Sequence, residues 1–442
     1  MSPELIAILM FAGVIVGVLM GYPLGFVLAG LGGIFGLTQI GIGVIPVFIS
    51  RIVSLAQNYV LIAAPLFIFM GVMLERSGAS ERMYGAMHLW MSGLRGGLAI
   101  GTVLICTLFA ACTGIVGASV TTMGLLALPA MLSRGYDKSL TAGTICAGGT
   151  LGILIPPSIM LVVYGPQAGI SVGKLFIAAI IPGLVLSSLY IIYIAIRCFI
   201  NPRLGPPMPI EERRGISLAR KTSLLITSLL PPLFLILAVL GTIFFGVASP
   251  TEAAGMGALA SIILTAIYGN LNFTTLKETG YRTIQATAMV FMVALGASMF
   301  LGVFMKLGGG KVIGEALLGL PWGKWGILAV IMFVIFILGM FIDWLGIIFI
   351  LVPLLTPIAA KLGFDPLWFA MLICVNLQMS FLTPPFAYAA FFLKGVAPPE
   401  LSIGDIYKSV IPFVALQATG LVLCVIFPPL ITWLPSLMIR AH

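Results

Sequence analysis

Charged side chains are scarce in this sequence. Of its 442 residues, 8% are charged and 61% are hydrophobic, and the mean hydropathy is +1.21. A soluble domain carries roughly 25% charged residues, so these charges are too few to cover a water-facing surface. The composition excludes an ordinary soluble protein. It predicts an integral membrane protein with many helices, because each crossing needs about 20 apolar residues.

Histidine is almost absent. Only His88 and His442 are present, so neither a His-Glu-x-x-His zinc site nor a Ser-His-Asp triad can be assembled. The segment 307–311 resembles a phosphate loop only superficially, because Val312 follows its lysine where Ser or Thr would reach magnesium. We therefore expect no enzyme and no cofactor.

Paired cysteines and an N-terminal basic region are also missing. The six cysteines all lie in apolar segments: Cys106, Cys112, Cys146, Cys198, Cys374 and Cys424. Their spacing indicates small buried hydrophobic side chains rather than disulfides or a zinc site. No basic residue precedes Arg51, so we expect no cleavable signal peptide.

Long apolar runs, separated by polar and Gly/Pro breaks, predict the membrane spans. These lie near 4–20, 23–38, 58–75, 174–199, 222–246, 253–269, 283–305 and 405–434. An interfacial stretch is expected around Arg51. Charges among apolar residues predict amphipathic arms at 75–95 and 308–324.

Two pairs of apolar segments are too short to cross the membrane comfortably. Segments 97–112 and 119–132 are joined by Cys-Thr-Gly-Ile-Val-Gly-Ala-Ser, and segments 325–341 and 344–360 meet near Asp343. We interpret each pair as a re-entrant helical hairpin.

Two further segments are interrupted by consecutive prolines. Segment 138–170 contains Pro156-Pro157, and segment 366–394 contains Pro384-Pro385. A proline lacks an N–H and clashes with the carbonyl one turn earlier. Two in succession predict a broken helix that leaves carbonyls near 152–156 and 380–384 without helical partners. A simple kink is the alternative for a single copy.

The two broken segments belong to an internal repeat. Residues 126–158 align without gaps on 354–386 at a constant offset, 384 − 156 = 228. Apolar residues often match by chance, whereas Pro, Gly and Asp do not. The matching pairs are Pro129/Pro357, Gly135/Gly363, Asp137/Asp365, Ala142/Ala370, Ile145/Ile373, Cys146/Cys374, Leu154/Leu382, Pro156/Pro384 and Pro157/Pro385.

The positive charges indicate the orientation. With the N-terminus outside, 15 of the 22 Lys and Arg residues lie on the inner side and 7 on the outer side, as the positive-inside rule requires. This bias is also the better explanation of the net charge of +9, because no basic surface suited to nucleic acid is present. Four crossings then separate the two broken helices, so the repeats are inverted.

These features predict an all-α polytopic membrane protein. Its inverted repeats contain two re-entrant hairpins and two Pro-broken transmembrane helices. The hairpins span 96–132 and 325–360. The predicted domains are N-terminal scaffold helices (1–57), a first inverted repeat (58–200), a cytoplasmic linker (201–221), further scaffold helices (222–282) and a second inverted repeat (283–442).

Broken helices in inverted repeats are typical of secondary transporters. Their substrate and ion sites lie near the middle of the membrane, where unwound backbone offers carbonyls to cations and half-helix N-termini to anions. At the hairpin tips, Thr113 and Ser119 could coordinate a cation or serve as helix N-caps. Asp343 could bind substrate or a proton, or could cap the next helix.

At these residues the chain resembles the large membrane subunit of the tripartite ATP-independent periplasmic (TRAP) transporters, the DctM-like family. The resemblance covers essentially the whole chain. The segments that support the resemblance most specifically are RGYDK (134–138), AGGTLGILIPPS (147–158), the hairpin 339–359 and LTPPF (382–386). It implies an elevator mechanism in which two hairpins and two broken helices move against a scaffold, driven by sodium.

The resemblance also implies two sodium sites. The first would use Thr113, Gly152, Ile155 and Pro156. The second would use Gly339, Ser380, Thr383 and Phe386, largely through carbonyls. Ser119 and Asp343 are the candidate substrate-binding residues.

The first hairpin tip and position 380 depart from the family pattern. The tip is often Ser-Gly-Ser-rich in the family, and glycine is usual where Ser380 stands. The tip ligands and the number of ions are therefore left open.

The expected function is import of a small organic acid across the bacterial inner membrane by a multi-pass permease subunit. The implied partners are a small four-helix membrane subunit and a periplasmic substrate-binding protein. The hairpin tip resembles a branch associated with mannitol, chloroaromatic or 2-oxo acid uptake. The alternatives are a self-sufficient carboxylate symporter of similar fold, or a channel or structural membrane protein.

Overall fold

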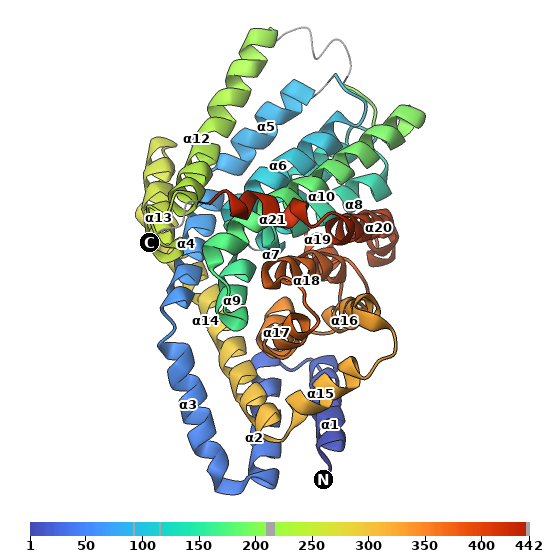
Figure 1. Ribbon diagram of the computed structural model, residues 1–442. Coiled ribbons are helices and arrows are strands. Elements are labelled where there is room, and N and C mark those ends of the chain that lie inside the picture. Colours follow the sequence, from blue (N-terminus) through green and yellow to red (C-terminus); the bar gives the residue numbers. More distant parts are fainter. Residues whose placement is uncertain (92, 115, 209–216, 439–442) are drawn as a thin grey trace.

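The computed structural model describes residues 1–91, 93–114, 116–208 and 217–438, with only the backbone described at 110–113 and 218. All regular elements in these ranges are helices (Figure 1). Seven of the described helical stretches are long and apolar enough to cross a membrane. The chain is therefore a polytopic all-α membrane protein, as the composition predicts.

One group of helices forms a framework. It consists of α1 (Pro3–Leu19), α2 (Leu24–Gln39), η1 (Gly41–Gly43), α3 (Val44–Ala56), η2 (Tyr59–Ile62), α4 (Ala63–Arg76), α12 (Leu218–Phe244), α13 (Pro250–Ile267) and α14 (Phe273–Lys306). Helix α14 packs against α2, α3 and α4, and α13 packs against α4 and α12. The α2 and α14 backbones touch, because a Cβ added at Gly296 would lie 2.1 Å from the Gly25 carbonyl oxygen. Small residues permit this close helix contact.

The remaining long helices form two copies of one motif. The first copy contains α6 (Gly97–Thr113), α7 (Val116–Leu132), α8 (Lys138–Thr150), η3 (Leu151–Ile153), α9 (Ile159–Ala168) and α10 (Val172–Ile200). The second contains α16 (Gly323–Gly339), α17 (Trp344–Lys361), α18 (Pro366–Ser380), α19 (Tyr388–Lys394) and α20 (Ile403–Ile426). Equivalent helices begin at the same offset, 344 − 116 = 228 and 366 − 138 = 228. The repeat detected in the sequence is a structural repeat.

Side-chain contacts with α20 establish that the repeats are inverted. Along α8, a Cβ at Gly143 would meet the Ser409 carbonyl, and Thr150 accepts a bond from Gln417, so α8 and α20 run in parallel. The first turn of α18 instead meets the end of α20, because the Trp368 indole N–H donates to the Cys424 carbonyl at 3.0 Å. Helices α8 and α18 therefore run in opposite directions.

Both broken helices begin with the same cap. The Asp137 carboxylate accepts a hydrogen bond from the Leu140 N–H at 2.8 Å, and the Asp365 carboxylate accepts one from the Trp368 N–H at 2.8 Å. Each bond satisfies a helix N–H that has no partner within the helix. The Asp match in the sequence repeat is therefore explained by helix capping.

We expect D137A and D365A each to lower the free energy of unfolding by about 1 kcal/mol, because each removes an N-cap oxygen. D137N and D365N keep an acceptor and should stay near the parent. Thermal unfolding in detergent measures the difference. Equal losses in the Ala and Asn variants would contradict the capping role.

Some predicted boundaries are wrong. The arms are shorter than expected, at α5 (Ala79–Met91) and α15 (Gly309–Leu318). The predicted last span, 405–434, is two helices, α20 and α21 (Pro429–Ser436), because Pro428 and Pro429 provide no N–H to continue the first. Within the predicted linker, η4 covers Pro202–Leu204.

The start of α14 differs most from the predicted span 283–305. The helix begins at Phe273, where the Asn272 side chain accepts from the Thr275 N–H at 2.8 Å. At the repeat offset, α14 corresponds to α3, η2 and α4 together, since 44 + 228 = 272 and 76 + 228 = 304. The predicted boundary at 282 therefore falls inside a continuous helix.

Candidate functional site

The tip of the first hairpin rests on the first helix break. Gly114 adopts a left-handed conformation (φ +61°), and a Cβ there would lie 3.5 Å from both the Pro157 carbonyl oxygen and the Ile159 nitrogen. Helix α6 ends at Thr113 and packs against η3, which contains Gly152. The backbones of these predicted ligands are thus brought to one place. The Thr113 side chain lies outside the described residues.

The first break is closed and buried. Residues 151–154 and 156–158 are buried, and the Ile155 side chain fills the space above Gly183 of α10. The Ser158 hydroxyl donates to the Ile153 carbonyl. Among the described residues, no backbone N–H donates to the carbonyls of Gly152, Leu154, Ile155 or Pro156. These carbonyls are therefore the candidate cation ligands of the first break.

The second break brings Gly339 and Ser380 into direct contact. A Cβ at Gly339 would lie 2.4 Å from the Ser380 Oγ and 2.7 Å from its Cβ. The Ser380 hydroxyl donates to the Phe336 carbonyl at 3.2 Å, and one turn earlier the Asn376 amide donates to the Met332 carbonyl at 2.6 Å. These two bonds fasten α18 to α16. The end of the second hairpin's first helix is thereby held against the break.

The hydroxyl groups at this break have acceptor capacity left. Thr383 Oγ1 donates to the Met379 carbonyl at 2.7 Å, and Ser380 donates as described. A hydroxyl has one proton and two lone pairs, so each of these oxygens can still accept. Uncharged oxygens near an unwound backbone are the donor set with which transporters of this architecture bind sodium.

The predicted row of free carbonyls at 380–384 is wrong for three residues. The Ser380 carbonyl accepts from the Thr383 N–H at 3.3 Å, that of Phe381 from the Ala389 N–H at 3.2 Å, and that of Thr383 from the Ala387 N–H at 3.2 Å. The chain recovers these bonds by turning tightly, and Ala387 has a left-handed φ of 36° as a result. A non-glycine residue in this region is strained.

The two breaks differ in exposure. Pro384 and Pro385 are exposed, and Thr383 and Phe386 are half-buried, whereas Pro156 and Pro157 are buried. The Tyr407 hydroxyl donates to the Pro385 carbonyl at 3.3 Å. The two breaks therefore follow similar chain paths but differ in their exposure to solvent.

Asp343 lies at the tip of the second hairpin beside the second break. It is the N-cap residue of α17, and its carboxylate faces the Trp344 and Leu345 N–H groups in the first turn of that helix. The carboxylate is half-buried and interacts electrostatically with Tyr388, whose ring stacks on Phe386 at 6.0 Å between centroids. This position agrees with the N-cap alternative for Asp343. Its binding role stays a prediction, and one residue can serve both purposes.

The two candidate residues of the first hairpin tip lie on different helices. Helix α7 begins at Val116, so Ser119 lies inside its first turn rather than at its N-cap, and it is buried with 1% of its surface exposed. Thr113 is the last residue of α6. The cap alternative for the Thr113 side chain lies outside the described residues.

Two buried polar residues were missed by the sequence reasoning. Asn376 keeps an unpaired amide oxygen, and neither polar atom of Gln378 has a hydrogen-bond partner in the described structure, although both side chains are fully buried. A buried polar group without a partner is costly. Both are polar residues within the apolar run that precedes Pro384, and this position in the sequence would have identified them.

The two copies interlock at the centre. The second hairpin helix α17 packs on α9, and α19 packs on α7 and α8. Cys146 of α8 is 3.7 Å from the Ala389 carbonyl of α19, and a Cβ at Gly117 would touch the Phe392 ring. The two copies are therefore packed directly against each other.

No three His, Cys, Asp or Glu side chains gather into a metal site within the described ranges. Comparison with known proteins agrees with the architecture. Residues 11–430 match the DctM component of the tripartite ATP-independent periplasmic transporters. The chain belongs to this DctM family. It is a large permease subunit of the inner membrane, and its relatives are transporter permeases rather than enzymes.

Several curated DctM relatives are similar over most of their length. The C4-dicarboxylate TRAP transporter large permease protein DctM of Pseudomonas aeruginosa is 31% identical over 388 residues, covering 87% of this chain and 88% of that protein. The ectoine TRAP large permease TeaC of Halomonas elongata is 29% identical, covering 98% and 99%. The isethionate TRAP permease DctMQ of Oleidesulfovibrio alaskensis is 31% identical, covering 93% and 65%.

A solved structure has a similar fold. The YdaH transporter of Alcanivorax borkumensis superposes with a TM-score of 0.63, covering 99% of this chain and 100% of that chain, at 15% identity. This similarity concerns the fold alone.

Proposed function

We propose that this DctM protein imports a small organic acid by sodium symport, receiving it from a periplasmic binding protein and working with a small four-helix membrane subunit. The observation that supports this proposal best is the contact of Gly339 with Ser380, beside Thr383. Hydroxyl oxygens that can still accept a hydrogen bond or a cation lie here, next to an unwound stretch of helix. C4-dicarboxylates, isethionate and ectoine, named for its relatives, each carry a carboxylate or sulfonate. This shared group supports an organic acid as substrate.

In this proposal each break holds one sodium ion. The first site uses Thr113, Gly152, Ile155 and Pro156, and the second uses Gly339, Ser380, Thr383 and Phe386. The substrate lies between the hairpin tips near Ser119 and Asp343. Two sodium ions entering across 100 mV supply about 4–5 kcal/mol, which is ample for accumulating a small anion.

The movement proposed is that of an elevator. The hairpins and broken helices form an interlocked unit, and the framework packs around α14. Moving one rigid unit against the other carries a buried site across the membrane without dismantling it. The polar site residues favour this over a lipid-facing structural role.

Reconstitution of the complete complex tests the function. In proteoliposomes, uptake of a labelled C4-dicarboxylate or 2-oxo acid should require both an inward sodium gradient and the loaded binding protein. Replacing sodium with choline, with and without a proton gradient, is the control. Uptake that is unaffected by sodium would overturn sodium coupling, and uptake driven by protons alone would assign the coupling to Asp343.

A further inference from the structure

A narrow apolar groove lies between α12 and α13 of the framework. It encloses about 330 Å³ and runs along α12 from Pro231 to Thr242 and along α13 from Ala253 to Ile267. Of the described residues that line it, only Thr242 is polar. The step from Pro231 to Thr242, 242 − 231 = 11 residues, spans about 16 Å at 1.5 Å per residue. The hydrocarbon core of a bilayer is about 30 Å thick, so the groove is about as long as one leaflet is deep.

The repeat counterpart of this helix pair is packed differently. At the repeat offset α1 matches the part of α12 that begins at residue 231, since 3 + 228 = 231, and α2 matches α13, since 24 + 228 = 252. A Cβ at Gly13 of α1 would lie 2.9 Å from the Leu31 side chain of α2. The matching residues are Gly241 and Leu259, and nothing described lies within 4 Å of a Cβ at Gly241. The contact that closes α1 against α2 is therefore missing between α12 and α13.

Three basic residues lie beyond the Pro231 end of the groove, and we call them the basic end: Arg82, Arg220 and Lys221. Helix α12 extends past α13 here (Figure 1). Residues 220, 224, 227 and 231 share one face of α12, so Arg220 is in line with the groove and its long side chain can reach back toward it. Arg82 of α5 donates to the Tyr268 carbonyl at 3.1 Å, and Tyr268 directly follows Ile267. The charge bias of the sequence predicts that this end faces the cytoplasm.

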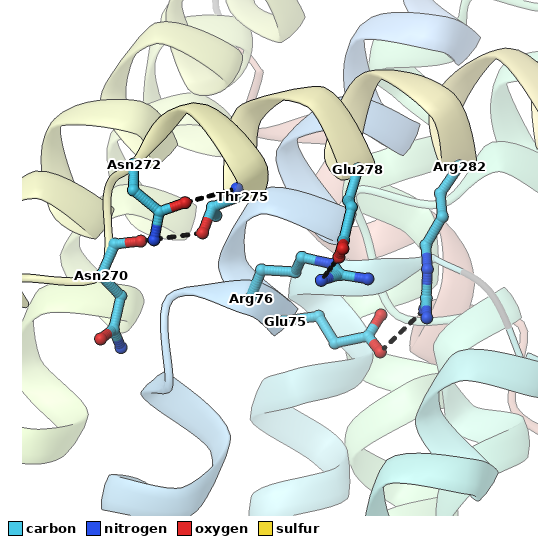
Figure 2. Close-up of polar contacts among 7 residues, drawn as sticks. All are labelled: Glu75, Arg76, Asn270, Asn272, Thr275, Glu278 and Arg282. Atoms are coloured by element: carbon cyan, nitrogen blue, oxygen red, sulfur yellow. Dashed lines mark hydrogen bonds and ion pairs between the residues drawn. The ribbon is translucent and has the colours of Figure 1, made fainter.

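The charges of the basic end are not neutralised by ion pairs. Nearby, Arg76 and Arg282 each pair with a glutamate (Figure 2). Within the described ranges no such pair is found for the basic end. Helix α12 contains no Asp or Glu, and the single acidic residue of α13, Glu252, lies at the opposite end of the groove. The groove therefore leads from an apolar lining to an unneutralised positive charge.

We propose that the groove binds one acyl chain of an anionic phospholipid and that the basic end holds its phosphate. Basic pockets between transmembrane helices on the cytoplasmic side bind anionic lipid headgroups. The apolar lining and the length of one leaflet suit the chain. A membrane-spanning helix of a partner subunit is about 10–12 Å wide, which is too wide to enter this narrow groove, and its apolar surface would leave the basic end without a counter-charge. The site is independent of the proposed sodium coupling.

The test measures which lipid the protein retains. The purified full-length transporter is exchanged into detergent micelles that contain phosphatidylglycerol or phosphatidylcholine with identical acyl chains. Native mass spectrometry then counts the lipids that stay bound to each chain. The parent should retain one phosphatidylglycerol and at least about tenfold less phosphatidylcholine, because phosphatidylcholine carries no net charge for the basic end to attract.

Variants test the headgroup site and the groove separately. R220Q and R82Q should each weaken phosphatidylglycerol retention about fivefold, the size of one lost basic residue near a membrane surface, whereas R220K should stay within about twofold of the parent. A260F fills the groove from α13 and A238F fills it from α12, since both alanines line it. Each should lower retention at least about tenfold. A266F is the matched control, because Ala266 is exposed on α13 outside the groove lining.

Three results would overturn this site. Equal retention of the two lipids, unchanged by R220Q and R82Q, would show that no headgroup is recognised. Unchanged phosphatidylglycerol retention in both A260F and A238F would show that no chain occupies the groove. If these two variants instead released a partner subunit or a second copy of the chain while the lipid stayed bound, the groove would be a protein interface. Size-exclusion chromatography confirms that each variant is folded, and the two groove variants on different helices guard against a defect in either.

Discussion

Replacing Gly339 by alanine is expected to reduce sodium-driven uptake by about 10- to 100-fold. The new methyl group would lie 2.4 Å from the Ser380 Oγ and 2.7 Å from its Cβ, so α16 and α18 must separate at the second break. Overpacking of this kind costs about 1–3 kcal/mol, and displacement of a binding group by about 1 Å can cost 10²-fold. The measurements are uptake rate and half-saturating sodium concentration in proteoliposomes.

A double substitution identifies the cause. S380G removes both atoms that the new methyl would meet, and the next neighbour, Leu377, lies at an ordinary 3.4 Å. G339A/S380G should therefore recover to within about threefold of S380G alone, giving a strong coupling in a double-mutant cycle. G30A is the matched control, because nothing lies within 4 Å of a Cβ at Gly30. If the double variant were no better than G339A, this contact would not explain the loss.

The second large effect is expected at Thr383. T383A removes an oxygen that still has lone pairs after its hydroxyl donates to the Met379 carbonyl. If this oxygen coordinates sodium, its loss should raise the half-saturating sodium concentration about tenfold or more, comparable to losing a hydrogen bond to a charged group, about 1.5–3 kcal/mol. Sodium titration of uptake measures this change.

Two variants separate sodium binding from a structural role. T383S retains the hydroxyl and should titrate like the parent, whereas T383V keeps the shape and should behave like T383A. A merely structural Thr383 would lower the amount of folded protein and the uptake in parallel, with an unchanged sodium requirement. That parallel loss would remove Thr383 from the proposed second site.

Local sequence was sufficient for the starts and breaks of the two Pro-broken helices. The starts of α8 and α18 follow from Asp137 and Asp365, whose side chains cap the helices that immediately follow. The breaks follow from Pro156-Pro157 and Pro384-Pro385, because a missing N–H acts on the residues next to it. These are short-range effects, and a constant offset of 228 residues was visible without knowing which helices touch.

Contacts between distant residues could not be predicted in the same way. The length of α14 depends on its packing and on its equivalence to α3, η2 and α4. The carbonyls at 380–384 find partners because the chain turns tightly after the prolines. Which break is exposed depends on the helices that cover it.

The sequence by itself therefore determined the class of protein, the repeat and the two breaks, because composition and proline chemistry act locally. Tertiary structure alone decided that Gly339 meets Ser380, that the Asn376 amide reaches the Met332 carbonyl, and that the Trp368 indole reaches the Cys424 carbonyl. Each of these pairs joins different helices. Their proximity is set by helix packing, which no local pattern of residues encodes.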